Sequence, residues 1–191
     1  NEIVRMEHWL EHYRKIGGTE VKFLIVDNDS DDGTFEMLKG QPDVILYTVK
    51  ETYNSRRKTA WTNYVIAQAG IKRWYLVVDS DEFLAYEGMD KILLTKYINI
   101  MQQNKKTVLK AVMLDMYPKG VIGSKDINKD QFREEYIYYD EADSYSYDSD
   151  RNQIGGGFLE RVFGEVNGIR TKAPLFFVSD YRFMLGSHHI Y

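Results

Sequence analysis

The 191-residue sequence contains no cysteine. This absence excludes a disulfide framework, a thiolate zinc site and a thiol nucleophile, and it fits a reducing compartment, so we expect a cytoplasmic protein. The sequence also shows no signal peptide and no apolar run near the roughly 18 residues of a transmembrane helix. We therefore expect no transmembrane segment.

An excess of charge of either sign is missing as well. Lys and Arg number 25 and Asp and Glu number 29, which gives a net charge of −4. This balance does not predict a nucleic-acid or anionic-membrane partner, and an anionic substrate would need a metal or a few placed cations. The composition, 43% hydrophobic and 28% charged, is typical of a globular chain with one sizeable core. We expect a single domain.

Helix and strand patterns alternate from the start of the chain to Leu114. Asn1 is the expected N-cap of the first helix, and Gly17 and Gly18 are its expected end. The alternation is typical of an α/β fold with a mostly parallel central sheet. Helices are expected over 3–16, 56–69 and 89–102, with a short one ending at Leu38, and strands over 21–26, 44–49, 74–78 and 107–114.

The pattern changes after Pro118. Residues 126–150 are rich in Asp, Glu, Tyr and Ser and show no clear period, so we predict a long surface excursion there. Two further strands are expected, over 158–163 and 175–178.

The apolar run 74–78 ends in three carboxylates, Asp79, Asp81 and Glu82. In open α/β sheets, ligands bind just beyond the carboxyl ends of the strands. Side chains alternate along an extended segment, so Asp79 and Asp81 are expected to point the same way. Paired oxygen ligands suit Mg²⁺ or Mn²⁺ shared with substrate phosphates, although a helix cap or a solvated strand end explains the pair equally well. Phe83 stands where an aspartyl-phosphate phosphatase would carry Thr or Val, which excludes that class.

A second acidic turn, residues 27–34, follows the strand over 21–26. Its spacing superficially suggests a calcium loop, but Asp32 and Leu38 occupy the positions where an EF-hand requires Gly and Glu. Asp27 is then either a turn residue or, at the carboxyl end of a strand, an acceptor for a nucleoside base or ribose.

A cationic cluster, Arg56, Arg57 and Lys58, begins the helix expected over 56–69. The helix dipole disfavours cations there, so a phosphate partner would explain them. A solvated charged face is at least as good an interpretation.

The order of these motifs resembles the family 2 glycosyltransferases, and within them a bacterial branch with an Asn-Glu start and an Asp-x-Asp-Glu-Phe motif. The resemblance covers nearly the whole chain and depends on order and spacing rather than on one motif. The matching segments are Asn1–Glu2, Trp9–Tyr13, Asp27–Thr34, Trp74, Asp79–Phe83, Leu114–Pro118, Gly155–Arg161, Lys172–Leu175 and Gly186–His188.

The resemblance implies a Rossmann-like GT-A fold over 1–191 that binds a nucleotide-diphosphate sugar and transfers the sugar to a saccharide or lipid-linked saccharide, with the inner membrane face as one place of action. It implies Mn²⁺ or Mg²⁺ held by Asp79, Asp81 and a late histidine, His188 in preference to His189. The first strand of that fold, which normally comes just before the Asn-Glu pair, is absent, so a fragment is expected. The predicted nucleotide-binding residues are Asp27, Asn28, Arg57, Lys58 and Asp79. The resemblance implies Asp27 and Asp79, whereas Arg57 and Lys58 come from the cationic cluster.

Family 2 enzymes are typically inverting, which requires a carboxylate base for the acceptor hydroxyl. Glu160, after the glycine run 155–157, is the first candidate and Asp115 the second; pairing with a nearby cation is the alternative role for Glu160. Tyrosines between 136 and 147 could stack on acceptor sugars or pack on the core. The rival functions are a sugar nucleotidyltransferase and a non-catalytic carbohydrate-binding module.

Overall fold

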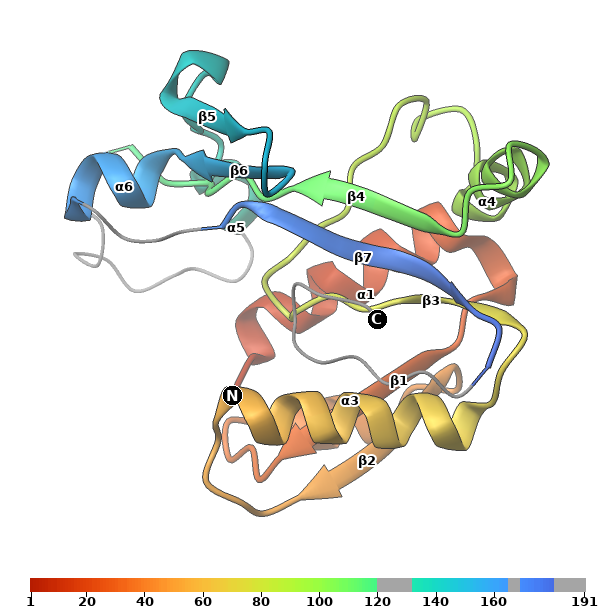
Figure 1. The fold of residues 1–191 in the computed structure, drawn as a ribbon. Helices are drawn as coiled ribbons and strands as arrows, with labels where there is room; N and C mark the ends of the chain where they lie inside the picture. The colour runs from red at the N-terminus through yellow and green to blue at the C-terminus, as the bar shows by residue number, and fades with distance from the viewer. Residues whose placement is uncertain (120–131, 165–168, 181–191) are drawn as a thin grey trace. The chain divides into compact units, whose positions relative to one another are not determined.

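The computed structural model describes residues 1–119, 132–164 and 169–180 of the chain (Figure 1). These residues form a mixed α/β structure, which confirms the predicted class. The chain divides into two compact units: unit 1 comprises Asn1–Leu109 and Leu175–Tyr191, and unit 2 comprises Lys110–Pro174. The single domain over 1–191 stays a prediction.

Unit 1 contains the helices and strands expected from the first half of the sequence, with small shifts at their ends. Its helix α4 begins at Leu94, five residues later than expected, because residues 86–92 form turns. The elements are α1 (Ile3–Gly17), the 3₁₀ helix η1 (Gly18–Glu20), β1 (Phe23–Asn28), α2 (Thr34–Lys39), β2 (Val44–Val49), α3 (Ser55–Ala69), β3 (Arg73–Leu76) and α4 (Leu94–Gln103).

Unit 2 contains the short elements α5 (Phe132–Glu135), η2 (Ala142–Ser144), β5 (Tyr145–Asp148), β6 (Gln153–Gly156) and α6 (Phe158–Phe163). The strand predicted over 158–163 is therefore wrong, because this segment is the helix α6. The segment 126–150 lies in part outside the described residues, and its described part forms α5, η2 and β5. Two strands, β4 (Val108–Val112) and β7 (Thr171–Val178), continue from one unit into the other.

The described strands form three sheets. β1 and β2 pair in parallel, in register from Phe23 with Val44 to Asn28 with Val49. The second sheet has the order β3-β7-β4, with β3 and β7 antiparallel, and β5 and β6 form an antiparallel hairpin. Only one parallel pair is found among the described strands, so a mostly parallel central sheet is not shown. Instead of pairing with each other, β1 and β3 both line one cavity of about 1350 Å³.

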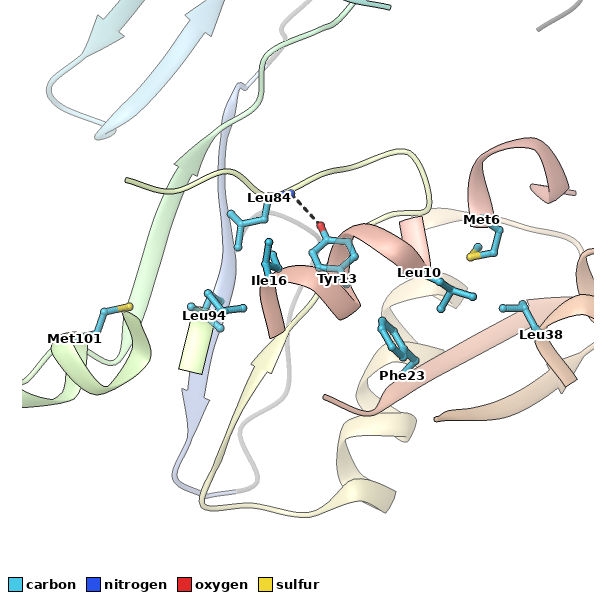
Figure 2. Packing of buried hydrophobic residues seen from close by; sticks show 10 residues of the cluster. Met6, Leu10, Tyr13, Ile16, Phe23, Leu38, Leu84, Leu94 and Met101 are labelled. Carbon is cyan, nitrogen blue, oxygen red and sulfur yellow. Dashed lines mark hydrogen bonds between the residues drawn. The ribbon is translucent and has the colours of Figure 1, made fainter. Parts of the chain in front are cut away.

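The core of unit 1 is built on α1, whose apolar side chains recur at helical spacing. Leu10 is 1% exposed, and its neighbours in the cluster include Phe23 of β1 and Leu38 of α2 (Figure 2). Burying one such leucine stabilises the fold by about 1.5–3 kcal/mol, so α1 is fixed against β1 and α2. The buried residues of α1 are Met6, Leu10, Tyr13, Ile16 and Gly17.

The N-terminus of α1 is held by the acidic turn that follows β1. The prediction that Asn1 is the N-cap is wrong. Glu2 occupies that position and makes no side-chain cap hydrogen bond. Instead, Asp32 Oδ2 accepts from the Ile3 amide at 3.1 Å, and Thr34 Oγ1 accepts from the Glu2 amide at 2.9 Å. Burial raises the pKa of Asp32, but the hydrogen bonds from Thr34 and from the Ile3 amide outweigh it and hold this pKa below its usual value. The turn therefore caps a helix distant in sequence.

Helix α1 also positions the acidic segment that follows β3. Trp9 Nε1 donates to the carbonyl oxygen of Asp79 at 2.9 Å. The Tyr13 hydroxyl donates to the Glu82 carbonyl at 3.0 Å and accepts from the Leu84 amide at 3.0 Å, the bond drawn in Figure 2. Burial raises the pKa of Tyr13 well above its usual value, so this hydroxyl stays protonated. Residues 79–84 are thus fixed by side chains of α1 rather than by strand pairing.

Candidate functional site

The carboxylates Asp27, Asp79 and Asp81 and the ammonium of Lys58 all line the cavity of unit 1. They come from the end of β1, the segment after β3 and the first turn of α3, which are distant in sequence. Asn28, the last residue of β1, lines the same cavity, so five of the residues predicted for nucleotide and metal binding are together in one concave space. Its volume exceeds the range of about 300–1,000 Å³ typical of small-molecule sites, so it has room for an extended ligand.

Asp27 is the fifth residue of β1 and is only 6% exposed. Its Oδ2 accepts a hydrogen bond from the Ser30 amide at 3.1 Å, which makes it a turn-forming residue as well as a cavity wall. Each carboxylate oxygen has more than one acceptor site, so a ligand hydroxyl or base N–H can still donate to the same group.

The Asn28 side chain connects the ends of two strands. Its Nδ2 donates to the Glu51 carbonyl at 2.9 Å, and its Oδ1 accepts from the Glu51 amide at 3.1 Å. Both ends of the amide are thus engaged with the backbone just after β2. The nucleotide-binding role predicted for Asn28 stays a prediction, and this clamp is the role that its contacts support.

The acidic segment after β3 forms a turn rather than an extended strand. The Glu82 amide donates to the Asp79 carbonyl at 3.1 Å, and Glu82 Oε2 accepts from the Asp79 amide at 2.8 Å. The extended backbone assumed for Asp79 and Asp81 is therefore wrong, although both residues line the same cavity.

The two aspartates meet different cations. Asp79 Oδ1 forms an ion pair with Lys58 Nζ, whereas Asp81 Oδ2 lies 3.9 Å from Arg5 Nη1. The Asp81 side chain is 60% exposed, so its contact with Arg5 is weak.

Arg57 and Lys58, at the start of α3, do not point to the same place. Asn54 caps the helix by accepting from the Arg57 amide at 2.9 Å. The Arg57 guanidinium turns to the preceding loop, where it donates to the Thr52 carbonyl at 2.6 Å and lies 3.2 Å from Glu51 Oε2. Of the two predicted nucleotide-binding cations, Lys58 lines the cavity and Arg57 does not.

The predicted histidine ligands, His188 and His189, lie outside the described residues, as do Gly186 and Ser187. In the parts of the chain that the structure describes, no group of three or more His, Cys, Asp or Glu side chains could hold a metal ion. The carboxylates Asp79 and Asp81 remain the described candidates, and the Asp79 carboxylate is paired with the Lys58 ammonium.

The two predicted base residues lie in unit 2. Glu160 is exposed, in the first turn of α6. Asp115 instead forms an ion pair with the buried guanidinium of Arg170, with its oxygens 3.2 and 3.3 Å from Nη1. Arg170 Nε also donates to the Gly156 carbonyl at 3.1 Å. Asp115 is thus engaged in holding Arg170, and of the two candidates Glu160 is the more accessible.

Local packing requires glycine at position 157, the last residue of the glycine run before Glu160. Gly157 has φ +81°, and a Cβ there would lie 2.6 Å from Cε1 of the Tyr145 ring. The predicted reason for these glycines, close approach of a sugar to the backbone, is therefore not needed to explain Gly157. Tyr145 packs inside unit 2 accordingly, whereas Tyr138, Tyr139 and Tyr147 are exposed.

A cluster around Asp140 in unit 2 was not predicted. Asp140 is 7% exposed; it accepts from the Tyr117 hydroxyl at 2.7 Å and from Arg161 at 2.8 and 3.0 Å. These bonds to Arg161, despite the opposing effect of burial, hold the pKa of Asp140 below its usual value. The Tyr117 ring stacks on Phe158 at 4.7 Å. The cluster fixes α6 and therefore the backbone that carries Glu160; no local sequence pattern pairs residues so far apart.

Comparisons with known proteins add no assignment. No family model, no curated protein and no solved structure matches this chain. None of the helices in the described residues is long and apolar enough to cross a membrane.

Asp27 provides the first test of the site. Replacing it by alanine is expected to weaken nucleoside-diphosphate binding by about 1–3 kcal/mol, because a charged hydrogen bond is lost, without unfolding the protein. Calorimetry measures the affinity, and Asp31→Ala, in the same turn but outside the cavity, is the matched control. A variant that melts early and binds normally would show that Asp27 only accepts from Ser30.

Proposed function

We propose that this chain is a metal-dependent, inverting glycosyltransferase of the GT-A fold. It would transfer a sugar from a nucleotide-diphosphate donor to a hydroxyl group of a saccharide or lipid-linked saccharide. The observation that carries the proposal is that Asp27, Lys58, Asp79 and Asp81 line one cavity of unit 1. Together with the order of motifs along the chain, this set matches what a nucleotide diphosphate needs.

The parts of a donor divide among these side chains by their chemistry. The carboxylate of Asp27, at the end of a strand, suits the hydroxyls or base N–H of a nucleoside. Lys58 supplies a positive charge for a phosphate oxygen. Asp79 and Asp81 would hold Mg²⁺ or Mn²⁺, with His188 as the further proposed ligand. When bound, the metal offsets the charge that develops on the diphosphate as it leaves.

Glu160 is the proposed general base. An inverting transfer needs one carboxylate to accept the proton of the acceptor hydroxyl as the bond to the sugar forms. Glu160 is exposed on a helix fixed by the contact of Arg161 with Asp140, so its carboxylate is open to a ligand. Asp115 is the poorer candidate for the base, because its carboxylate is already paired with the Arg170 guanidinium.

The test is a reaction assay with nucleotide-diphosphate sugars and saccharide acceptors in the presence of Mn²⁺. A thermal-shift panel of nucleoside diphosphates and nucleotide sugars, with and without Mn²⁺, first selects the donor. The proposal predicts release of a nucleoside diphosphate and glycosylation of the acceptor. Pyrophosphate release from a nucleoside triphosphate and a sugar phosphate would instead identify a nucleotidyltransferase, and saccharide binding without nucleotide binding would identify a binding module.

A further inference from the structure

The ion pair between Lys58 and Asp79 joins two residues that the proposed function assigns to different parts of the ligand. The ammonium contacts Oδ1 of the aspartate, and the side chains are 29% and 34% exposed. A pair at this depth is stronger than a fully exposed one, because solvent screens it less. In this arrangement the carboxylate proposed for the metal already has a cation on it.

The two partners differ in how easily they can move. The Asp79 backbone is held from both sides, since Trp9 Nε1 donates to its carbonyl and Glu82 accepts from its amide. Lys58 reaches the carboxylate through a flexible four-carbon stem from the first turn of α3. A competing cation would therefore displace the lysine and leave the aspartate where it is.

The cavity offers the displaced ammonium no equally good partner on α3. The first turn of α3 contains Arg56 and Arg57, and cations at a helix N-terminus are disfavoured by the helix dipole. An anion next to α3 would satisfy both the ammonium and the helix terminus. Binding of a metal to Asp79 therefore favours binding of an anion to Lys58.

We infer that Lys58 acts as an internal counter-cation of Asp79 that a divalent metal displaces, and that the released ammonium then binds the diphosphate. This inference rests on the proposed function and deepens it. It predicts that Lys58 changes the affinities for the two ligands in opposite directions. Lys58 weakens metal binding in the absence of an anion, and it strengthens anion binding. Metal and diphosphate would then favour each other's binding through Lys58 as well as by direct contact.

The test is to replace Lys58 by methionine, which keeps the length of the stem and removes the charge. Mn²⁺ alone is titrated by electron paramagnetic resonance of the free ion, and inorganic pyrophosphate alone is titrated by calorimetry without metal. Lys58→Met is expected to bind Mn²⁺ about two- to tenfold tighter and pyrophosphate about two- to tenfold more weakly than the wild type.

The matched control is Lys50→Met. Lys50 also pairs with an aspartate, Asp29, at 2.7 Å, but it does not line the cavity. The Lys50→Met variant therefore changes the net charge by the same amount as Lys58→Met without changing the cavity. It is expected to leave both affinities unchanged. Thermal melting checks the fold, and Lys58→Gln is the second variant if the methionine variant melts early.

An Mn²⁺ affinity of Lys58→Met equal to or weaker than that of the wild type would overturn the inference, as would absence of Mn²⁺ binding in both proteins. The proposed function fails on different evidence, namely a wild-type protein that binds no nucleotide sugar. The Mn²⁺ arm decides the inference without any nucleotide, so the two failures are distinguishable.

Discussion

Replacing Glu160 by glutamine is expected to lower turnover about 10²–10⁴-fold while donor affinity stays close to that of the wild type. Glutamine keeps the shape and polarity of the side chain but cannot accept the acceptor's proton. Glu160 is exposed in the first turn of α6, so the exchange removes no buried contact and the fold is expected to be unchanged. Steady-state kinetics with saturating donor, beside calorimetric donor titration, separates the two effects.

The matched control for this variant is Glu134→Gln, which removes an exposed carboxylate from another helix of the same unit. It is expected to leave turnover unchanged. Near-normal turnover of Glu160→Gln would contradict the assignment and return attention to Asp115. Asp115→Asn is expected to lower stability as well, because it leaves the buried Arg170 guanidinium without its charged partner, and thermal melting would reveal this.

Replacing Asp81 by alanine is expected to abolish the enhancement of nucleoside-diphosphate affinity by Mn²⁺. In the wild type this enhancement is expected to be about 5–150-fold, the usual range of coupling between two ligands. Asp81 is 60% exposed and 3.9 Å from Arg5, so its loss costs little stability and its role should be visible in binding alone. Without metal, the variant is expected to bind the diphosphate at least as well as the wild type, because one negative charge is gone.

Asp90→Ala is the control for the Asp81 variant, because Asp90 is an exposed aspartate of the same unit outside the cavity. Calorimetric titration of the diphosphate with and without Mn²⁺ gives the coupling for each protein. If Mn²⁺ enhanced the diphosphate affinity of Asp81→Ala as much as that of the wild type, Asp81 would not be a metal ligand. Asp79 would then be the only described aspartate still proposed to bind the metal.

Much of unit 1 could be predicted because its signals are local. Helix α1 was predicted from its helical spacing, and its apolar face, with Leu10 and Tyr13, is buried. The change from apolar to acidic residues at Asp27 and Asp79 predicts strand ends within three residues of those observed, Asn28 for β1 and Leu76 for β3. Both aspartates line the same cavity.

The remaining features depend on contacts between distant segments. β7 lies between β3 and β4 and pairs with β3 antiparallel, which no local pattern specifies. Short apolar runs fit a helix or a strand equally well, and α6 is such a run, bounded by Gly157 and Gly164, both with positive φ. The ion pair of Lys58 with Asp79 likewise could not be predicted from the sequence, because it joins side chains from two segments that only the fold brings together.

The most direct test of the central claim is one calorimetric comparison on the wild-type chain. A nucleoside diphosphate, chosen by the thermal-shift panel, is titrated with and without Mn²⁺, and Mn²⁺ is titrated with and without the diphosphate. The account predicts that each ligand raises the affinity of the other by the same factor, about 5–150-fold, because the two share the cavity that Asp79 and Asp81 line. A diphosphate affinity that Mn²⁺ leaves unchanged would contradict it.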